Sequence, residues 1–262
     1  METMITSVQN PKVKRLLLLQ QKSAERRKAG LFVVEGRREV ERCVAKGFDI
    51  DTVFVCRDIY GDGQLSDSLP ADTCIEVSRN VYDRMAYRGG TEGIIAIVRT
   101  RMLTLDDLTL SDHPLLVVLE SVEKPGNLGA VLRSADAAGA DAVIVCDPLT
   151  DLYNPNLIRS STGAIFSVPC VACSSEECIR FLKEKNIRIL TAQLQDSSLY
   201  YDTDMTQGTA IVMGTEATGL TDVWRKAADA HIRIPMLGIL DSLNVSVSAA
   251  VLLFEAVRQR KD

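Results

Sequence analysis

The second half of the chain alternates short apolar runs with segments of helical pattern. The apolar runs have the length and composition of buried strands and cover 115–119, 142–146, 167–171, 187–192, 209–213 and 230–234. The segments of helical pattern cover 127–138, 156–161, 176–185, 223–228 and 244–259. Strands that alternate with helices need crossover connections, which produce a parallel sheet. We therefore expect a C-terminal α/β domain built on a parallel sheet.

The first part of the chain also mixes strands and helices. Strands are expected at 31–34, 52–56 and 93–98, and helices at 11–22, 36–46 and 81–87. Asn10 and Pro11 predict a helix start, because Asn is a good N-cap and Pro is preorganised for the first helical position. The predicted fold class is α/β, with a small N-terminal domain over 1–98, a charged linker over 99–113 and a second domain over 114–262.

Composition excludes several classes of protein. No apolar stretch reaches the roughly 18 uncharged residues of a membrane span. The start, Met-Glu-Thr-Met-Ile-Thr-Ser, has no basic segment before an apolar block, so we expect no secretion signal and a cytoplasmic location. The dinucleotide-binding pattern G-x-G-x-x-G, the phosphate-loop pattern G-x-x-x-x-G-K-[ST] and the nucleophile pattern G-x-S-x-G are all missing from the sequence.

Seven cysteines, an odd number, are scattered through apolar surroundings and do not resemble a disulfide framework. Cys170 and Cys173 have the spacing of metal ligands, and Cys178 is close by. Neither a second cysteine pair nor a histidine cluster completes four ligands. Structural cysteines and no metal are therefore the expectation, with a zinc site as the weaker alternative.

The N-terminal stretch 11–28 is strongly basic, with seven basic residues against the single acid Glu25, in a chain of net charge −5. A basic arm on an acidic protein indicates a local contact with a polyanion such as RNA. A solvated helix face explains the same run equally well. The residues assigned to RNA contact are Lys12, Lys14, Arg15, Arg26, Arg27 and Lys28.

Polar, glycine-punctuated segments lie at the edges of apolar runs at 127–133, 214–220 and 234–246. Loops at strand ends carry the chemistry of many α/β proteins, so the segments predict one composite site. Asn127 follows a Pro-Gly turn and is expected to cap a helix. Arg133 lies about 600° further around that helix and should point elsewhere, toward a phosphate, a second chain or solvent.

The other two segments also pair a functional reading with a structural one. Glu216, bracketed by Gly214 and Gly219, is suited to accept hydrogen bonds from a polar ligand or to cap the next helix. Ser242 and Asn244 precede a strongly apolar helix, whose N-terminus favours an anion such as a carboxylate. Plain helix capping is the alternative for both of these residues.

Taken together, N-x-G-x-x-x-R, G-x-E-x-x-G-L and I-P-M-x-G-x-x-x-S-L-N-V-S resemble the signature motifs of the SpoU (TrmH-type) RNA ribose 2′-O-methyltransferases of the SPOUT superfamily. The resemblance covers the chain from about Pro114 to its end. The segments 5–11, 32–36 and 93–96 resemble the substrate-binding domain of members that act on ribosomal RNA, which members acting on tRNA usually lack.

The resemblance implies a C-terminal deep trefoil knot, a homodimer in which Arg133 helps to complete a site near the partner, and S-adenosylmethionine as methyl donor. The implied cofactor residues are Thr191, Ala192, Gly214, Glu216, Gly219, Ile234, Met236, Leu243 and Asn244. The implied catalytic residues are Asn127, Arg133, Glu216, Ser242 and Asn244. Arg133 is expected to bind RNA as well.

The expected reaction is methylation of an RNA ribose 2′-hydroxyl, with 23S ribosomal RNA as first substrate. A guanidinium hardly deprotonates, so Arg133 is expected to bind the RNA phosphate and stabilise the alkoxide while a phosphate oxygen or water takes the proton. A tRNA methyltransferase and an inactive ribosome-associated RNA-binding protein are the alternatives. Thr215, where the family usually has Asn, keeps the second alternative open; Thr91-Glu92 replaces the usual Pro-Gln outside the site.

Overall fold

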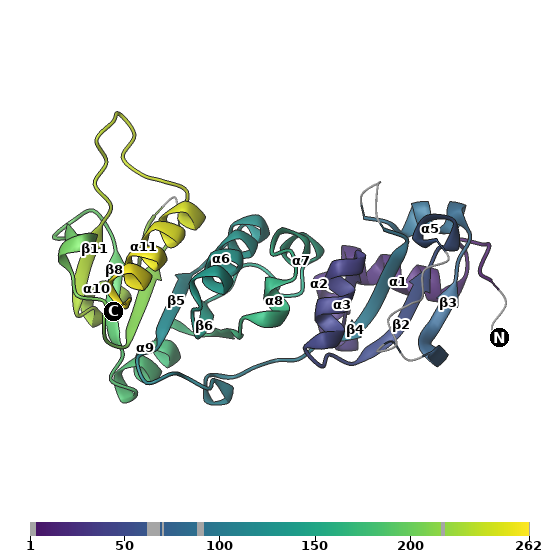
Figure 1. Ribbon diagram of the computed structural model, residues 1–262, viewed down its shortest axis with the longest axis horizontal. Coiled ribbons are helices and arrows are strands. Elements are labelled where there is room, and N and C mark those ends of the chain that lie inside the picture. Colours follow the sequence, from purple (N-terminus) through teal and green to yellow (C-terminus); the bar gives the residue numbers. More distant parts are fainter. Residues whose placement is uncertain (1–3, 62–68, 70, 88–91, 216–217, 262) are drawn as a thin grey trace. The chain divides into compact units, whose positions relative to one another are not determined.

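The computed structural model describes residues 4–61, 69, 71–87, 92–215 and 218–261 (Figure 1). The chain divides into two compact units. The first combines Met1–Arg101 with Tyr153–Ser167, and the second combines Met102–Leu152 with Val168–Asp262. Among the described helices, none is both long enough and apolar enough to cross a lipid bilayer.

The described residues of the first unit form a four-stranded sheet in the order β1-β4-β2-β3. The strands are β1 (Leu31–Glu35), β2 (Ile50–Val55), β3 (Cys74–Glu76) and β4 (Ile94–Arg99). β4 is antiparallel to β1 and β2, whereas β2 and β3 are parallel. The longer strands were predicted from their apolar runs. β3 was missed because three residues are too few to show a strand pattern.

Helices pack against this sheet within the first unit. They are α1 (Pro11–Gln21), α2 (Ser23–Ala29), α3 (Arg37–Ala45), α4 (Arg57–Tyr60), η1 (Ala71–Thr73) and α5 (Arg79–Met85). The predicted start of α1 is confirmed, because the Asn10 side chain accepts the backbone N–H of Lys12 at 2.9 Å. The carboxylate of Glu92 accepts the N–H of Arg37 at 2.5 Å and so caps α3. Thr91 lies outside the described residues.

The chain between α1 and α2 is extended at Lys22, with φ −119° and ψ 112°. Arg26 in α2 is buried, at 3% exposure. Its Nη1 donates hydrogen bonds to the backbone carbonyl oxygens of Leu19 at 2.6 Å and Gln20 at 3.2 Å. These carbonyls belong to the last turn of α1, whose backbone acceptors have no partners inside the helix. Arg26 therefore satisfies the end of one helix from within the next.

Two short helices that are distant in sequence also belong to the first unit, α7 (Pro155–Ser160) and α8 (Ala164–Ser167). Aromatic contacts attach them to β1 and its neighbours. The ring of Phe32 stacks on Tyr153, with centroids 4.2 Å apart, and Phe48 meets Phe166 edge-on at 5.3 Å. The sequence placed this segment in the second domain, because contacts between distant aromatic side chains leave no periodic pattern.

The described part of the second unit contains a seven-stranded sheet in the order β7-β6-β5-β10-β8-β11-β9. The strands are β5 (Leu115–Glu120), β6 (Ala142–Cys146), β7 (Cys170–Cys173), β8 (Arg188–Ala192), β9 (Ser198–Leu199), β10 (Thr209–Met213) and β11 (Ala230–Arg233). All neighbouring pairs are parallel. The predicted parallel sheet is confirmed, and β7 begins three residues later than expected, since α8 extends to Ser167.

Helices alternate with these strands, as the sequence pattern predicted. They are α6 (Pro125–Ala138), α9 (Ser175–Glu184), α10 (Asp222–Ala227) and α11 (Val245–Gln259), with η3 (Tyr200–Asp202) after β9. The second unit also takes up most of the charged stretch 99–113 that the sequence marked as a linker. This stretch contains η2 (Leu105–Asp107), and Leu105, Leu108 and Leu110 pack against the core of the second unit.

Candidate functional site

The polar segments identified in the sequence follow central strands of the second unit. Segment 127–133 lies in α6, which follows β5, and segment 214–220 follows β10, which lies beside β5. Segment 234–246 connects β11 to α11, and α11 packs against α6. Because the strands are parallel, their carboxyl ends lie at one edge of the sheet. The fold therefore brings the beginnings of these segments to the same edge.

A direct hydrogen bond joins the first and third segments. Nδ2 of Asn244 donates to Oδ1 of Asn127 at 3.2 Å. The Oδ1 atom of Asn244 accepts the N–H of Ser246 at 3.0 Å, so Asn244 is the N-cap of α11, which is the structural alternative that the sequence offered for it. The predicted cap at Asn127 is wrong. Pro125 occupies the first turn and starts α6 two residues earlier, with Lys124 at the N-cap, which leaves the Asn127 side chain for Asn244.

The second segment is a tight loop closed by its own backbone. Thr215 and Gly219 exchange backbone hydrogen bonds of 3.3 and 3.0 Å. A Cβ atom at Gly214 would lie 2.2 Å from the carbonyl carbon of Gly219, so no side chain fits there. Oγ1 of Thr215 accepts the N–H of Thr218 at 3.0 Å. Thr215 thus holds the loop together in place of the usual Asn, and Glu216 lies outside the described residues.

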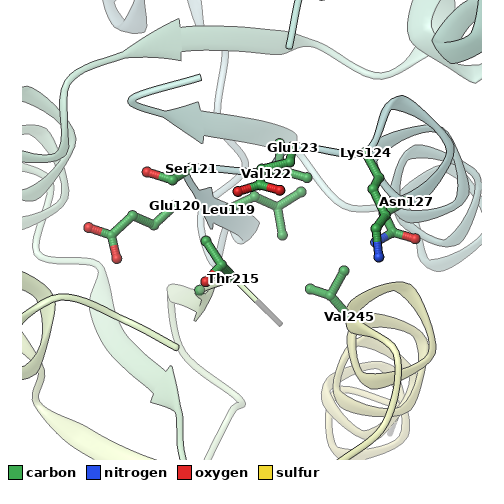
Figure 2. A pocket seen from close by; sticks show the side chains of 10 residues that line it. Leu119, Glu120, Ser121, Val122, Glu123, Lys124, Asn127, Thr215 and Val245 are labelled. Carbon is green, nitrogen blue, oxygen red and sulfur yellow. The ribbon is translucent and has the colours of Figure 1, made fainter. Parts of the chain in front are cut away.

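A cavity of about 120 Å³ opens where β5, α6 and this loop meet (Figure 2). Its lining residues are Leu119, Glu120, Ser121, Val122, Glu123, Lys124, Asn127, Gly214, Thr215 and Val245. Figure 2 shows Asn127 and Val245 on neighbouring helices, with Thr215 on another side of the pocket. Of the residues predicted for the site, Asn127 and Gly214 line this cavity.

A second cavity of about 150 Å³ lies beside the segment that leads into α11. Its lining residues are Ala192, Gln193, Leu194, Ile232, Arg233, Ile234, Met236, Asp241, Ser242, Leu243, Ser248 and Leu252. Five residues predicted for the site are among them: Ala192, Ile234, Met236, Ser242 and Leu243. Leu243 lines the second cavity and Val245 lines the first, so Asn244 lies in sequence between residues of the two cavities.

Gln193 and Glu120 were missed by the sequence analysis. Oε1 of Gln193 is buried without a hydrogen-bond partner among the described residues, and the side chain lines the second cavity. An unpartnered buried amide oxygen is costly unless a ligand satisfies it. The buried carboxylate of Glu120 accepts both the N–H and the hydroxyl of Thr221, at 2.9 and 2.6 Å. Their positions directly at strand ends are the signal that could have identified them.

Thr191 and Arg133 are among the predicted residues that line neither cavity. Thr191 is fully buried, and its hydroxyl lies 2.6 Å from Nδ1 of His231, so its side chain is already engaged. Arg133 is exposed on α6, opposite the buried Val131 and Leu132 side of that helix. Its guanidinium makes no ion pair or hydrogen bond with residues in the described part of the chain, which agrees with the expectation that it points elsewhere.

The basic residues predicted to bind RNA differ in exposure. Lys12, Lys14, Arg27 and Lys28 are exposed, and so is Arg15, which pairs with Asp51 at 3.3 Å. The prediction that Arg26 contacts RNA is wrong. Arg26 is buried and donates a hydrogen bond to the end of α1, so it lies on no surface that RNA could contact. The other basic residues stay candidates.

Comparison with known proteins identifies the family to which each part of the chain is similar. Residues 114–254 match the SpoU rRNA Methylase family, and residues 10–96 match the MRM3-like substrate binding domain. The chain belongs to the SpoU family. The family prediction made from the motifs is confirmed, as is the prediction of an RNA methyltransferase that uses S-adenosylmethionine.

Named relatives of this SpoU protein are similar over most of their length. This chain is 42% identical over 189 residues to the 23S rRNA (guanosine-2′-O-)-methyltransferase RlmB of Escherichia coli K12. The match covers 70% of this chain and 78% of the relative. This chain is 32% identical over 252 residues to the 23S rRNA (uridine(2479)-2′-O)-methyltransferase of Streptomyces viridochromogenes, covering 90% and 85%. The AdoMet-bound rRNA methyltransferase of Sinorhizobium meliloti superposes with a TM-score of 0.87 at 28% identity, covering 98% and 97%.

Proposed function

We propose that this SpoU-family protein transfers a methyl group from S-adenosylmethionine to a ribose 2′-hydroxyl of ribosomal RNA, with 23S rRNA as the first candidate. The observation that carries the proposal is the hydrogen bond between Asn244 and Asn127, which joins two signature segments beside a loop built around Gly214. A methyl acceptor and a methyl donor must meet at one place, and positioning them together supplies much of the rate.

The residues beside the second cavity fit the methyl donor. The Ile234 and Met236 side chains offer an apolar surface for a purine, and the buried Oε1 of Gln193 lacks a partner that an amino group could supply. Gly214 lets the backbone of Gly219 close the loop beside the first cavity. The bound cofactor supplies an electrophilic methyl group on a sulfonium. Ala192, Gly219, Leu243, Asn244 and the backbone of Thr191 complete the proposed pocket, together with Glu216.

Arg133 is proposed to hold the RNA. A guanidinium binds a phosphate through two parallel N–H donors, and it stays charged at neutral pH. It would therefore fix the nucleotide and stabilise the negative charge that develops on the 2′-oxygen, while a phosphate oxygen or water accepts the proton. Asn127, Ser242 and Asn244 are proposed to orient the ribose, with Glu216 as a further polar contact.

Ribosomal RNA is favoured over tRNA by the first unit. Residues 10–96 match a substrate-binding domain that tRNA-modifying members usually lack. The exposed Lys12, Lys14, Arg27 and Lys28 of this unit are proposed to contact RNA phosphates. Such a substrate would place the activity in the cytoplasm.

A homodimer and a trefoil knot in the second unit form part of the proposal. The segment between β11 and α11, yellow-green in Figure 1, extends away from its own sheet. Leu237 on it is 95% exposed, and Ile239 and Leu240 are also exposed, as are Val247 and Phe254 on α11. Several large apolar side chains exposed on one segment and on the helix after it favour a protein interface. A second copy is the proposed partner, and its approach would bring Arg133 to the neighbouring site.

The deciding experiment is transfer of a labelled methyl group from S-adenosylmethionine to ribosomal RNA, followed by mapping of the 2′-O-methyl position. RNA from cells with and without the gene should differ at one position, and the purified protein should restore it. An inactive RNA-binding protein would show no calorimetric signal with S-adenosylmethionine. Methylation of tRNA alone, or full rRNA methylation after deletion of residues 1–98, would contradict the proposed substrate or the role of the first unit.

A further inference from the structure

Three cysteine thiols meet at one end of the sheet in the second unit. Cys146 ends β6 and Cys173 ends β7, and the two residues are partners in the register of these parallel strands. Cys178 lies in α9, which follows β7 directly. The three Sγ atoms all lie within 4.8 Å of one another. Within the described chain, this is the only cluster of three or more ligand-type side chains that could hold a metal ion.

The spacing of the sulfur atoms is close to that of a metal–thiolate site. With metal–sulfur bonds of about 2.3 Å, sulfur ligands in trigonal or tetrahedral arrangement lie about 3.8–4.0 Å apart. Small side-chain rotations would bring atoms within 4.8 Å to that separation. Soft thiolate ligands select thiophilic ions over Mg²⁺ or Ca²⁺.

The cluster is anchored inside the protein yet reachable from one side. Cys146 and Cys178 are fully buried, whereas Cys173 is partly exposed and lines a cavity of about 420 Å³. Arg180 and Glu177 line the same cavity. A small ion can therefore reach the sulfur atoms, and a water molecule or an outside ligand can take a remaining coordination position.

The carboxylates of Glu177 and Asp147 lie near the cluster and act on Cys173. Three thiolates beside two carboxylates would concentrate negative charge, which a divalent cation offsets better than a monovalent one.

We propose that Cys146, Cys173 and Cys178 bind one thiophilic divalent cation of the Zn²⁺ type, with its remaining position directed to the cavity beside Cys173. The ion would tie together the ends of β6 and β7 and the first part of α9. It is separate from the proposed methyl-transfer site, since none of its ligands lines either cavity there.

The weaker zinc alternative from the sequence rested on Cys170 and Cys173 with Cys178 close by, and in the structure Cys146 takes the place of Cys170. Residues three apart in a strand point to opposite faces of the sheet, so Cys170 and Cys173 cannot both reach one ion from β7. Cys146 takes that place through strand pairing, a contact across 27 residues of sequence that the spacing of cysteines does not reveal. Cys170 consequently provides a matched control on the same strand.

The test is a titration of the full-length protein with Co²⁺, after reduction and removal of metal, in the absence of oxygen. We expect one equivalent to bind with the strong absorption of thiolate-bound cobalt, and Zn²⁺ to displace it. Cys173→Ala should weaken binding about one hundredfold or more, while Cys170→Ala should bind as the parent protein does. Cys178→Ala provides a second variant with the same expected loss.

Thermal unfolding of the same proteins gives an independent measurement. Zn²⁺ should raise the Tm of the parent protein and of Cys170→Ala, but not that of Cys173→Ala, because an ion that binds only the folded state stabilises it. The absence of stoichiometric cobalt binding to the parent protein would overturn the proposal. So would undiminished binding by Cys173→Ala, or an equal loss in Cys170→Ala.

Discussion

Asn244 and Asn127, 117 residues apart in sequence, are joined side chain to side chain by a 3.2 Å hydrogen bond. Asn244 uses its two amide ends for different purposes. Its Oδ1 accepts the backbone N–H of Ser246 and so caps the start of α11. Its Nδ2 donates to Asn127 on α6. Only an uncharged amide offers an acceptor and a donor together on a side chain of this length. The start of one helix is thus coupled to the first turn of another.

Two variants of Asn244 should separate its effect on stability from its effect on methyl transfer. Asn244→Asp keeps the capping oxygen but loses the donor, so stability should change by less than about 1 kcal/mol while kcat/KM for RNA methylation falls at least about tenfold. Asn244→Ala loses both and should also lower the free energy of unfolding by about 1 kcal/mol. Urea denaturation and methyl-transfer kinetics measure the two quantities. Equal activity of Asn244→Asp and the parent protein would refute a role for the donor.

Gly214 predicts a strong effect of the smallest substitution. In Gly214→Ala the new methyl group would lie 2.2 Å from the backbone of Gly219, so the loop must move. We expect a loss of about 1–3 kcal/mol of stability and at least about tenfold weaker binding of S-adenosylmethionine, measured by calorimetry. Gly126→Ala is the matched control, because nothing lies within 4 Å of a Cβ atom there and α6 favours Ala. Similar affinities in the two variants would count against the loop as part of the pocket.

Substitution of Arg133 should lower turnover without weakening the binding of S-adenosylmethionine. Arg133→Lys keeps the charge but removes the planar pair of donors, so kcat should fall at least about tenfold with the affinity for S-adenosylmethionine unchanged. Arg225→Lys serves as control, since Arg225 is a surface residue of α10 paired with Asp222 at 3.6 Å. Near-parental turnover of Arg133→Lys would exclude a bidentate contact with phosphate.

The sequence predicted those features that follow from local patterns. The alternation of apolar runs and helices predicted the parallel sheet, because each strand and helix is recorded in neighbouring residues. The motifs predicted which segments meet, and Asn244 caps α11, which was the structural alternative for that residue. Asn127 was expected to cap α6 and does not, since Pro125 just before it starts the helix first. Pro125 and Asn127 are both good signals for a helix start. Which of them begins the helix depends on its first residue, and a sequence pattern fixes that residue only to within a few positions.

Features that depend on how one element packs against another were not predicted. The burial of Arg26 follows from how α2 folds back on the end of α1. The meeting of Cys146 with Cys173 follows from strand register, and the stacking of Tyr153 on Phe32 follows from tertiary packing. None of these contacts leaves a periodic trace in one sequence. Prediction from composition treated Arg26 as one more surface cation and was wrong there.

The exposed apolar side chains on α11 and on the segment before it predict the oligomeric state. Phe254→Asp, in the middle of the exposed face of α11, should convert a dimer to a monomer in light scattering at micromolar concentration, because a charge cannot be buried unpaired in an interface. Leu149→Asp is the control, since Leu149 is also apolar and exposed but lies neither on α11 nor on the segment before it. A parent protein that is monomeric at the same concentration would contradict the proposed homodimer.

Arg26 and Arg27 are adjacent in α2 yet predict opposite phenotypes. Arg26 is buried and donates to carbonyl oxygens of α1, so Arg26→Ala leaves these acceptors without a partner and should cost about 1–3 kcal/mol of stability. Arg27 is exposed, so Arg27→Ala should leave stability within about 0.5 kcal/mol. RNA affinity should instead fall, and the slope of log affinity against log salt should decrease by about one unit, as expected when one phosphate contact is lost. Unchanged affinity and slope for Arg27→Ala, and likewise for Lys28→Ala, would mean that this basic run is only a solvated helix face.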